Sequence, residues 1–168
     1  MSIFIGLGAN LDHPRHGNPI QTLSRALVCL GDVGVTPVRR SRWYRTSPVP
    51  VSDQPWYVNA VAEVHTGLGP EATLAALHRI EELFGRVRGE RDAPRWIDLD
   101  LLDYESELKS NKNNKLVILP HPRLHERAFV LLPLAELAPT WQHPILHEAI
   151  TTLIARLPAE QKIAPVGD

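Results

Sequence analysis

Hydrophobic and polar residues alternate along the chain with two different spacings, which predict both strands and helices. Residues 2–9 form a short apolar run rich in β-branched and aromatic side chains, typical of a buried strand. Asn18 can cap a helix that starts at Pro19 and carries apolar residues on one face. Gly31 follows the last apolar position. We therefore expect a strand and then a helix that ends at Gly31.

The middle of the chain repeats these patterns. Residues 35–44, 57–66 and 96–104 are β-prone runs, and residues 70–85 carry a helical stripe that begins with a proline and ends with a glycine. The resulting order is strand, helix, strand, strand, helix, strand. This order is typical of an α+β fold with a ferredoxin-like antiparallel sheet, on which we expect helices packed on both sides.

The remaining segments read as connections and peripheral pieces. Residues 47–55 are rich in proline, which cannot donate to a sheet, so they predict a long connection of the kind that binds something. Residues 105–115 are hydrophilic and predict a mobile surface loop. Short helical pieces include residues 147–157, and a frayed, peripheral tail is expected from residue 158. The length of 168 residues favours a single domain over residues 1–168.

The charge balance restricts the possible partners. There are 18 Lys and Arg against 19 Asp and Glu, a formal net charge of -1, which argues against a protein that coats nucleic acid or an anionic membrane. Cys29 is the single cysteine, and no apolar run approaches the length of a membrane span. We expect a cytoplasmic monomer that binds no nucleic acid and no membrane.

Two carboxylates near the start of the third β-prone run are candidate metal ligands. In an extended strand Asp98 and Asp100 project from the same face, about 7 Å apart at the backbone. Like charges at this separation repel, and a divalent cation such as Mg²⁺ would relieve the repulsion. An isolated pair of this kind is more often structural, with one Asp in solvent and the other paired with an Arg.

The arginines that precede the two aspartates favour a catalytic metal site over a purely structural ion pair. Of the 18 cations 14 are Arg, and four of them lie in the loop of residues 86–96: Arg86, Arg88, Arg91 and Arg95. Planar guanidinium groups beside a carboxylate-bound Mg²⁺ form a receptor for a polyphosphate. The alternative is a solvated loop neutralised by Glu90 and Asp92.

Three weaker signals accompany this segment. Glu81 lies at the edge of a helical apolar stripe, so it needs a partner, either an Arg of the following loop or a ligand hydroxyl or amine. Tyr57 and Asn59 share one strand face and could bind a flat heterocycle, although such pairs are usually part of the core edge. His121 and His125 have a zinc-like spacing but no third nearby ligand, which favours contacts with phosphate.

Taken together these segments resemble one enzyme family, the 6-hydroxymethyl-7,8-dihydropterin pyrophosphokinases of folate synthesis. The motifs that carry the resemblance are Asp53-Gln54-Pro55, Tyr57-x-Asn59-Ala60, Glu81 before Arg86-Val87-Arg88, Ala93-Pro94-Arg95, Ile97-Asp98-Leu99-Asp100-Leu101-Leu102, and Pro120-His121-Pro122-Arg123 through Phe129. The resemblance implies an ATP-dependent diphosphotransferase that moves pyrophosphate from ATP to the pterin hydroxymethyl group and releases AMP.

The resemblance also implies roles for individual residues. Asp98 and Asp100 would bind two Mg²⁺ ions, and Arg86 and Arg95 would be catalytic. The ATP-binding residues would be Glu81, Arg88, Arg95, His121 and Arg127. The pterin-binding residues would be Tyr57, Asn59 and Phe129, with the backbone of Thr46, Ser47 and Val49. The loops of residues 47–56 and 86–96 would close over the ligands and exclude water.

Two rival functions remain open from the sequence. A nucleic-acid-binding module could use the arginine loop, but it predicts more Lys and a positive net charge. A metal-dependent phosphohydrolase could use the same Asp pair. The product distinguishes this hydrolase from a pyrophosphokinase, because hydrolysis gives ADP or free phosphate whereas the transfer gives AMP.

Overall fold

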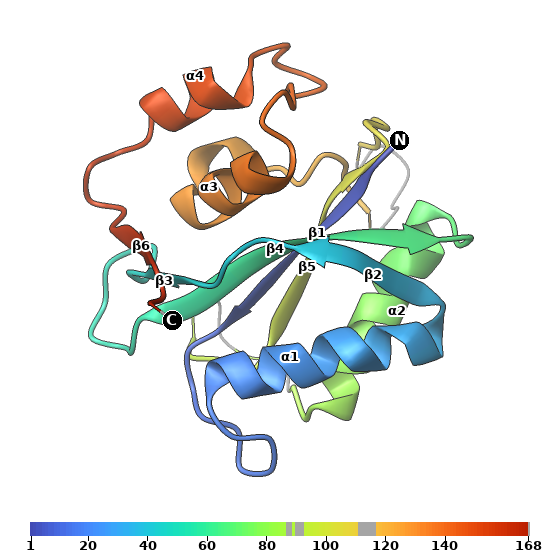
Figure 1. Cartoon of the computed structure of the whole chain (residues 1–168), viewed down its shortest axis with the longest axis vertical. Coiled ribbons are helices and arrows are strands. Elements are labelled where there is room, and N and C mark those ends of the chain that lie inside the picture. The colour runs from blue at the N-terminus through green and yellow to red at the C-terminus, as the bar shows by residue number, and fades with distance from the viewer. Residues whose placement is uncertain (87–88, 90–92, 111–116, 168) are drawn as a thin grey trace.

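The computed structural model describes residues 1–86, 89, 93–110 and 117–167 of the chain, and these form one antiparallel sheet with helices on both faces (Figure 1). The helices are α1 (Pro19–Cys29), α2 (Pro70–Leu83), α3 (Ala128–Leu137) and α4 (Ile150–Ala155), with 3-10 turns at Leu30–Val33 and Leu124–Glu126. The strands are β1 (Ile3–Ala9), β2 (Val35–Arg40), β3 (Tyr44–Thr46), β4 (Tyr57–Thr66), β5 (Asp98–Tyr104) and β6 (Ile163–Pro165).

The sheet has the split arrangement that the element order predicts. The strands lie in the order β5-β1-β4-β3-β6, with β2 also paired to β4, and all the pairs are antiparallel. The first strand therefore lies between the last two long strands, as in a ferredoxin-like sheet. This confirms the predicted fold class.

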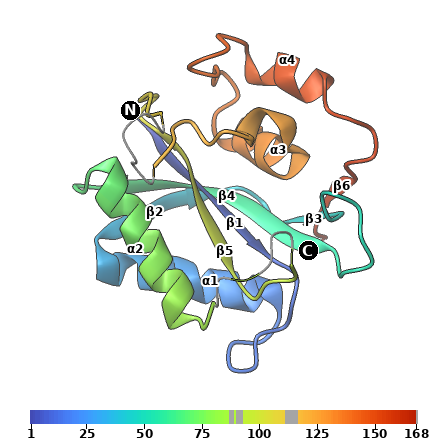
Figure 2. The same ribbon diagram turned by 180° about the vertical axis from the view of Figure 1, so that it is seen from behind.

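Two hydrophobic cores lie between the sheet and its helices, one on each face of the sheet. On one face α1 and α2 pack against β1 and β5, and on the other α3 packs against β4 and α4 packs against α3 (Figure 2). Ile5 and Leu99 belong to the first core, and Phe4 and Leu102 to the second. Most of the candidate functional residues lie at the second face, near the start of α3, whereas Glu81 belongs to α2 at the first face.

Helix α1 begins as predicted, but the chain turns away later than expected. The Asn18 side chain accepts from the Gln21 amide, and the Gln21 side chain accepts in return from the Asn18 amide, a full capping box. A 3-10 turn then follows, and Gly34, not Gly31, adopts the left-handed conformation with φ 82°. The α-helix itself ends at Cys29, within two residues of the predicted end at Gly31, and the 3-10 turn, which was not predicted, extends the helical path to Val33.

Two predicted strands have different limits. The run 35–44 is two strands, because β2 ends at Arg40 and β3 starts at Tyr44. Between them the Ser41 amide donates to the Val61 carbonyl and the Ser41 hydroxyl accepts from the Val61 amide, which interrupts the regular ladder. Strand β5 starts at Asp98, not at residue 96, because the preceding residues turn to contact the end of β1.

The tail is not frayed. Its residues Ile163–Pro165 form β6 and pair with β3 at the edge of the sheet, and the Val166 amide donates to the Trp43 carbonyl. The expectation failed because pairing with an exposed strand edge leaves no hydrophobic pattern in so short a segment.

The polar loop after β5 makes backbone and side-chain contacts through Lys109. Lys109 exchanges backbone hydrogen bonds with Leu119 and forms an ion pair of 2.9 Å with Glu71. The first part of the segment 105–115 is therefore held by contacts with other parts of the chain, and residues 111–116 lie outside the described residues. The mobility of the segment stays a prediction. Among the residues described, no helix is long and apolar enough to cross a membrane.

Candidate active site

A pocket of about 160 Å³ opens where β1, β4 and β5 approach the start of α3. Its walls come from segments far apart in sequence: the glycines of β1, the loop after β3, the first half of β4, the start of β5 and the segment that enters α3. The lining residues are Gly6, Leu7, Gly8, Thr46, Ser47, Val49, Gln54, Tyr57, Asn59, Ala60, Arg95, Asp98, Asp100, Arg123, Arg127, Phe129 and Val130.

Strand β5 directs both of its first two carboxylates into this pocket. Leu99 and Leu101 are buried in the core on the opposite face, so Asp98 and Asp100 both face the pocket. Burial raises the pKa of Asp100 to about 7, and the negative charge of Asp98 adds to the shift, while Arg127 opposes it. The pair thus favours a positive ligand at neutral pH.

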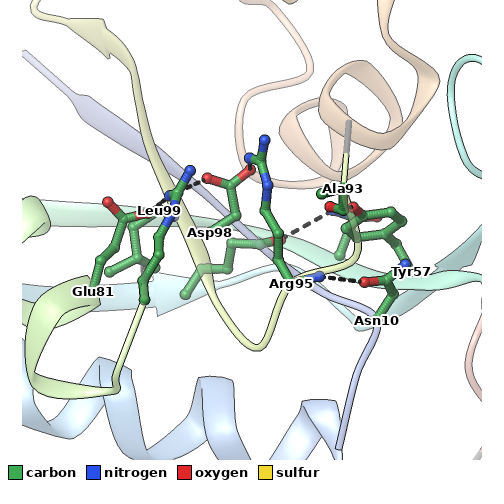
Figure 3. Close-up of polar contacts among 10 residues, drawn as sticks. Asn10, Tyr57, Glu81, Ala93, Arg95, Asp98 and Leu99 are labelled. Carbon is green, nitrogen blue, oxygen red and sulfur yellow. Dashed lines mark hydrogen bonds and ion pairs between the residues drawn. The ribbon is translucent and has the colours of Figure 1, made fainter. Parts of the chain in front are cut away.

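Two arginines contact the two oxygens of the first of these carboxylates, and Figure 3 shows Arg95 beside Asp98. Arg86 Nη1 lies 2.7 Å from Asp98 Oδ1, and Arg95 Nη1 lies 3.0 Å from Asp98 Oδ2. Arg86 also pairs with Glu81, whose Oε2 accepts from the Leu99 amide at 2.9 Å. The alternative in which Asp98 pairs with Arg is therefore present in the structure, and it brings cationic groups to the carboxylate pair.

Glu81 is almost completely buried, with 2% of its surface exposed. Burial raises the pKa of Glu81, an effect opposed by the Leu99 amide and by Arg86. Of the two partners considered from the sequence, the structure shows an arginine of the following loop. Glu81 therefore acts on the pocket through Arg86 and through the backbone of β5.

The opposite wall of the pocket has the groups that recognise a flat polar ring. Asn59 is buried; its Oδ1 accepts from the Thr46 hydroxyl at 2.6 Å, and its Nδ2 donates to the Leu7 carbonyl at 3.3 Å. Tyr57 lies on the same face and donates to the Ala93 carbonyl at 3.4 Å. These hydrogen bonds fix the orientation of the Asn59 amide.

Phe129 supplies the aromatic surface on the other side. It is the second residue of α3, and the Arg127 guanidinium lies 5.3 Å from the centre of its ring. An aromatic ring at a helix start and a second one on β4 can together bind both faces of a heterocycle. A positive charge beside Phe129 then suits an anionic group attached to that heterocycle.

His121 lies near the arginines but is not among the residues that line the pocket. Burial, followed by the charge of Arg127, lowers the pKa of His121 to about 4, so its ring is neutral at pH 7. Its Nδ1 accepts from the Arg123 amide at 3.2 Å. The hydrogen of the neutral ring is therefore on Nε2, which makes Nε2 the donating nitrogen.

Asn10 is a residue that the sequence analysis did not single out. Its Nδ2 donates to Gln54 Oε1 at 2.8 Å and to the Pro55 carbonyl at 2.9 Å, while its Oδ1 accepts from the Arg95 amide at 2.8 Å. Asn10 therefore links the loop after β3 to the arginine loop, and Figure 3 shows its contact with Arg95. No local pattern reveals this role, because both partners are distant in sequence.

The structure brings most of the predicted site residues together. Of the fourteen, ten line the pocket: Thr46, Ser47, Val49, Tyr57, Asn59, Arg95, Asp98, Asp100, Arg127 and Phe129. Arg86, Glu81 and His121 lie outside the lining, and Arg88 lies outside the described residues. Gly8, Gln54 and Arg123 line the pocket without having been predicted as site residues.

The acidic side chains of the pocket are candidate ligands for a magnesium ion. Within residues 1–86, 89, 93–110 and 117–167 no cluster of three or more His, Cys, Asp or Glu side chains could hold a metal. Two aspartates are nevertheless the pattern expected for Mg²⁺, which is typically bound by one or two carboxylates together with substrate phosphates and water. The residues thus fit a metal that arrives with a polyphosphate.

Comparison with known proteins decides the family. Residues 4–139 match the family described as 7,8-dihydro-6-hydroxymethylpterin-pyrophosphokinase (HPPK). The chain belongs to this family. This confirms the resemblance stated from the motifs, and the HPPK match covers every predicted site residue.

Curated HPPK relatives span both short and long proteins. The chain is 41% identical over 137 residues to the 2-amino-4-hydroxy-6-hydroxymethyldihydropteridine pyrophosphokinase of Methylorubrum extorquens, covering 81% of this chain and 82% of the relative. It is 39% identical over 139 residues to the enzyme of the same name from Haemophilus influenzae, again covering 82% of each. It is 34% identical over 98% of its length to Folic acid synthesis protein fol1 of Pneumocystis carinii, of which it spans only 21%.

A solved structure supports the fold. The chain aligns with the crystal structure of Plasmodium falciparum HPPK-DHPS A437G/K540E with pterin and p-hydroxybenzoate, with a TM-score of 0.64 and 15% sequence identity. The alignment covers 92% of this chain and 43% of the other. At this identity the likeness shows the fold alone.

Proposed function

We propose that this chain transfers the terminal diphosphate of ATP to the hydroxymethyl oxygen of 6-hydroxymethyl-7,8-dihydropterin, giving AMP and the pterin diphosphate in folate biosynthesis. One observation carries the proposal: the carboxylate pair with its arginines and the wall with its amide and aromatic side chains line one pocket. A phosphohydrolase needs only the carboxylate pair and its arginines. A transferase that joins a phosphate to a heterocycle needs both within reach of each other.

The pterin is assigned to the wall formed by β4, the loop after β3 and the start of α3. The fixed amide of Asn59 can both donate to and accept from the ring edge, and the backbone of Thr46, Ser47 and Val49 borders it. Tyr57 and Phe129 lie in the same pocket and would cover the two ring faces. This wall would therefore select a flat ring with alternating donors and acceptors.

The triphosphate is assigned to the cationic side. Arg95 and Arg127 line the pocket, and Arg86 reaches it by way of Asp98. Guanidinium groups bind phosphate oxygens through two parallel hydrogen bonds and stabilise the charge that develops during transfer. His121, neutral with its hydrogen on Nε2, would donate a further hydrogen bond, and Arg88 stays a prediction from the resemblance.

Asp98 and Asp100 are the residues that would hold magnesium. When bound, the metal supplies positive charge to the phosphates and lowers the pKa of a coordinated hydroxyl group. The carboxylates can serve only when ionised, and burial of Asp100 beside Asp98 disfavours its ionised form until a cation is present. Release of Asp98 by Arg86 and Arg95 would also free both guanidinium groups for the phosphates.

The proposed transfer is a single displacement at the β-phosphorus of ATP. The pterin hydroxyl oxygen forms a bond to the β-phosphorus of ATP, the bond from that phosphorus to the oxygen bridging to the α-phosphorus breaks, and AMP leaves with the bridging oxygen. The hydroxyl proton is released to solvent, so no strong protein base is required. The residues' task is to place the oxygen in line with the breaking bond and to exclude water.

The product distinguishes the proposal from its rivals. The protein should be incubated with ATP, Mg²⁺ and 6-hydroxymethyl-7,8-dihydropterin, and the nucleotides followed by ³¹P NMR or anion-exchange chromatography. We expect AMP and pterin diphosphate in equal amounts. ADP or free phosphate would indicate a phosphohydrolase, and the absence of AMP would rule out the transfer.

A matched pair of variants tests the assigned carboxylates. Asp100→Ala should remove turnover and weaken binding of Mg-ATP while leaving pterin binding within about twofold, since Asn59 and its partners are untouched. Asp103→Asn is the control, because this Asp lies on the same strand but binds the Trp141 indole at 2.9 Å and does not line the pocket. Normal turnover by Asp100→Ala would exclude the metal assignment.

A further inference from the structure

The tail that follows α4 contacts two walls of the pocket with two adjacent residues. Gln161 reaches the start of α3, and Lys162 reaches the loop after β3. Both residues lie beyond residue 139, where the match to the HPPK family ends. Figure 1 shows this segment passing from α4 to the sheet edge, where β6 lies beside β3.

Gln161 provides the helix cap that the local sequence of α3 lacks. The residue before the helix is Arg127, whose side chain has no acceptor, and no side chain caps the helix from that position. Instead Gln161 Oε1 accepts from the Ala128 amide at 2.8 Å, and its Nε2 donates to the Glu126 carbonyl at 2.7 Å. One side chain thus holds the backbone on both sides of Arg127.

The neighbouring residue holds the opposite wall through its backbone. The Ser47 amide donates to the Lys162 carbonyl at 2.9 Å, and the Lys162 amide donates to the Ser47 hydroxyl at 3.1 Å. Thr46 pairs with Ile163 in the same ladder. The backbone that carries Ser47 and Thr46 is therefore fixed relative to Gln161 by a single peptide unit.

We propose that Gln161 is a positioning residue for the pterin, because it fixes Phe129 and Arg127 at the start of α3 relative to Ser47 across the pocket. The inference rests on the proposed function and assigns it a part of the chain outside the family match. Gln161 is half-buried and does not line this pocket, so it acts through the α3 backbone and not by touching the pterin. If the start of α3 were no longer held, the gap between Phe129 and Tyr57 would widen. Arg127 would also shift, but Arg95, the other arginine that lines the pocket, would stay in place, so pterin binding should suffer more than ATP binding.

The test separates substrate positioning from general stability. Gln161→Met keeps the length of the side chain and removes both hydrogen bonds. We expect the KM for the pterin to rise about fivefold, as loss of a helix cap contact implies. The KM for ATP should rise less, by about twofold, because Arg127 is displaced but Arg95 is not. Gln161→Glu keeps the acceptor for the Ala128 amide and should recover most of the pterin affinity.

The matched control is Lys162→Ala, because the contacts of Lys162 with Ser47 are made by its backbone alone. It should leave both KM values unchanged. Equal changes in the two KM values of Gln161→Met, no change in either, failure of Gln161→Glu to recover affinity, or global unfolding of Gln161→Met would each overturn the proposal. If the unaltered protein forms no AMP, the proposed function fails instead, and equilibrium binding of the pterin by fluorescence then tests Gln161 on its own.

Discussion

Asn10 and Arg95 exchange two hydrogen bonds, from the Asn10 amide to the Arg95 carbonyl at 3.0 Å and from the Arg95 amide to Asn10 Oδ1 at 2.8 Å. The end of β1 therefore fixes the backbone that presents the Arg95 side chain to Asp98. The same Asn10 side chain binds Gln54 and the Pro55 carbonyl on the pterin side. A single buried amide thus links the two loops that were predicted to close over the ligands.

Two substitutions of Asn10 should separate these links. Asn10→Ala removes both and should lower kcat/KM by roughly 10- to 100-fold, because small displacements of positioning groups cost this much. Asn10→Asp keeps the acceptor for the Arg95 amide but places a carboxylate against the Pro55 carbonyl, so mainly the KM for the pterin should rise. Steady-state kinetics with each substrate varied in turn would check this, and identical profiles for the two variants would contradict it.

Gly8 is required by the position of Asn59. A Cβ at Gly8 would lie 2.7 Å from Asn59 Nδ2, and Asn59 cannot yield without losing its bonds to Thr46 and Leu7. Gly8→Ala should therefore weaken pterin binding roughly tenfold or more. Gly6→Ala is a fitting control, because a Cβ there lies 3.5 Å from Leu102 in ordinary contact. Titration calorimetry with the pterin should show a loss for the first variant only.

The sequence predicted the features that depend on neighbouring residues and missed the contacts between residues that are far apart along the chain. The helix start at Asn18 and the facing of Asp98 and Asp100 depend on neighbours in sequence, so capping rules and strand alternation predict them. The pairing of β6 with β3 and the contacts of Asn10 join residues far apart along the chain. Neither has a periodic signature, because one rests on backbone groups and the other on a single amide.

For Glu81 the sequence predicted one of its contacts and missed the other. Its place at the edge of a helical stripe predicted that it needs a partner, and the loop arginine was one of two candidates. The Leu99 amide was not foreseen, because it becomes a partner only when β5 packs beside α2. Spacing therefore predicts that a buried carboxylate needs a partner, and packing decides which partner it has.

Glu81 variants should distinguish its two contacts by stability. Glu81→Ala leaves the Leu99 amide without its acceptor and Arg86 with Asp98 alone, so the free energy of unfolding should fall by about 2–4 kcal/mol. Glu81→Gln keeps an acceptor for the amide and should cost roughly half as much. Urea denaturation would measure both, and equal losses would show that the amide contact contributes nothing.

Asp100 should lower the stability of the folded protein above about pH 7. Its pKa in the folded protein is about 7, above its ordinary value of 3.8, so between these values the folded state binds more protons than the unfolded state. The protonated Asp100 carboxyl favours the folded state, and this stabilisation is fully present below about pH 4 and is lost as the pH rises through 7. Above pH 7 the folded protein therefore carries the full cost of burying an ionised Asp100. Asp100→Asn removes the penalty, and without divalent cations its Tm at pH 8 should exceed that of the unaltered protein by roughly 2–6 °C. At pH 4 the difference in Tm should vanish.

Thermal denaturation at both pH values would measure this difference in Tm. Added Mg-ATP should make the unaltered protein the more stable of the two at pH 8, because only the ionised carboxylate gains a cation partner.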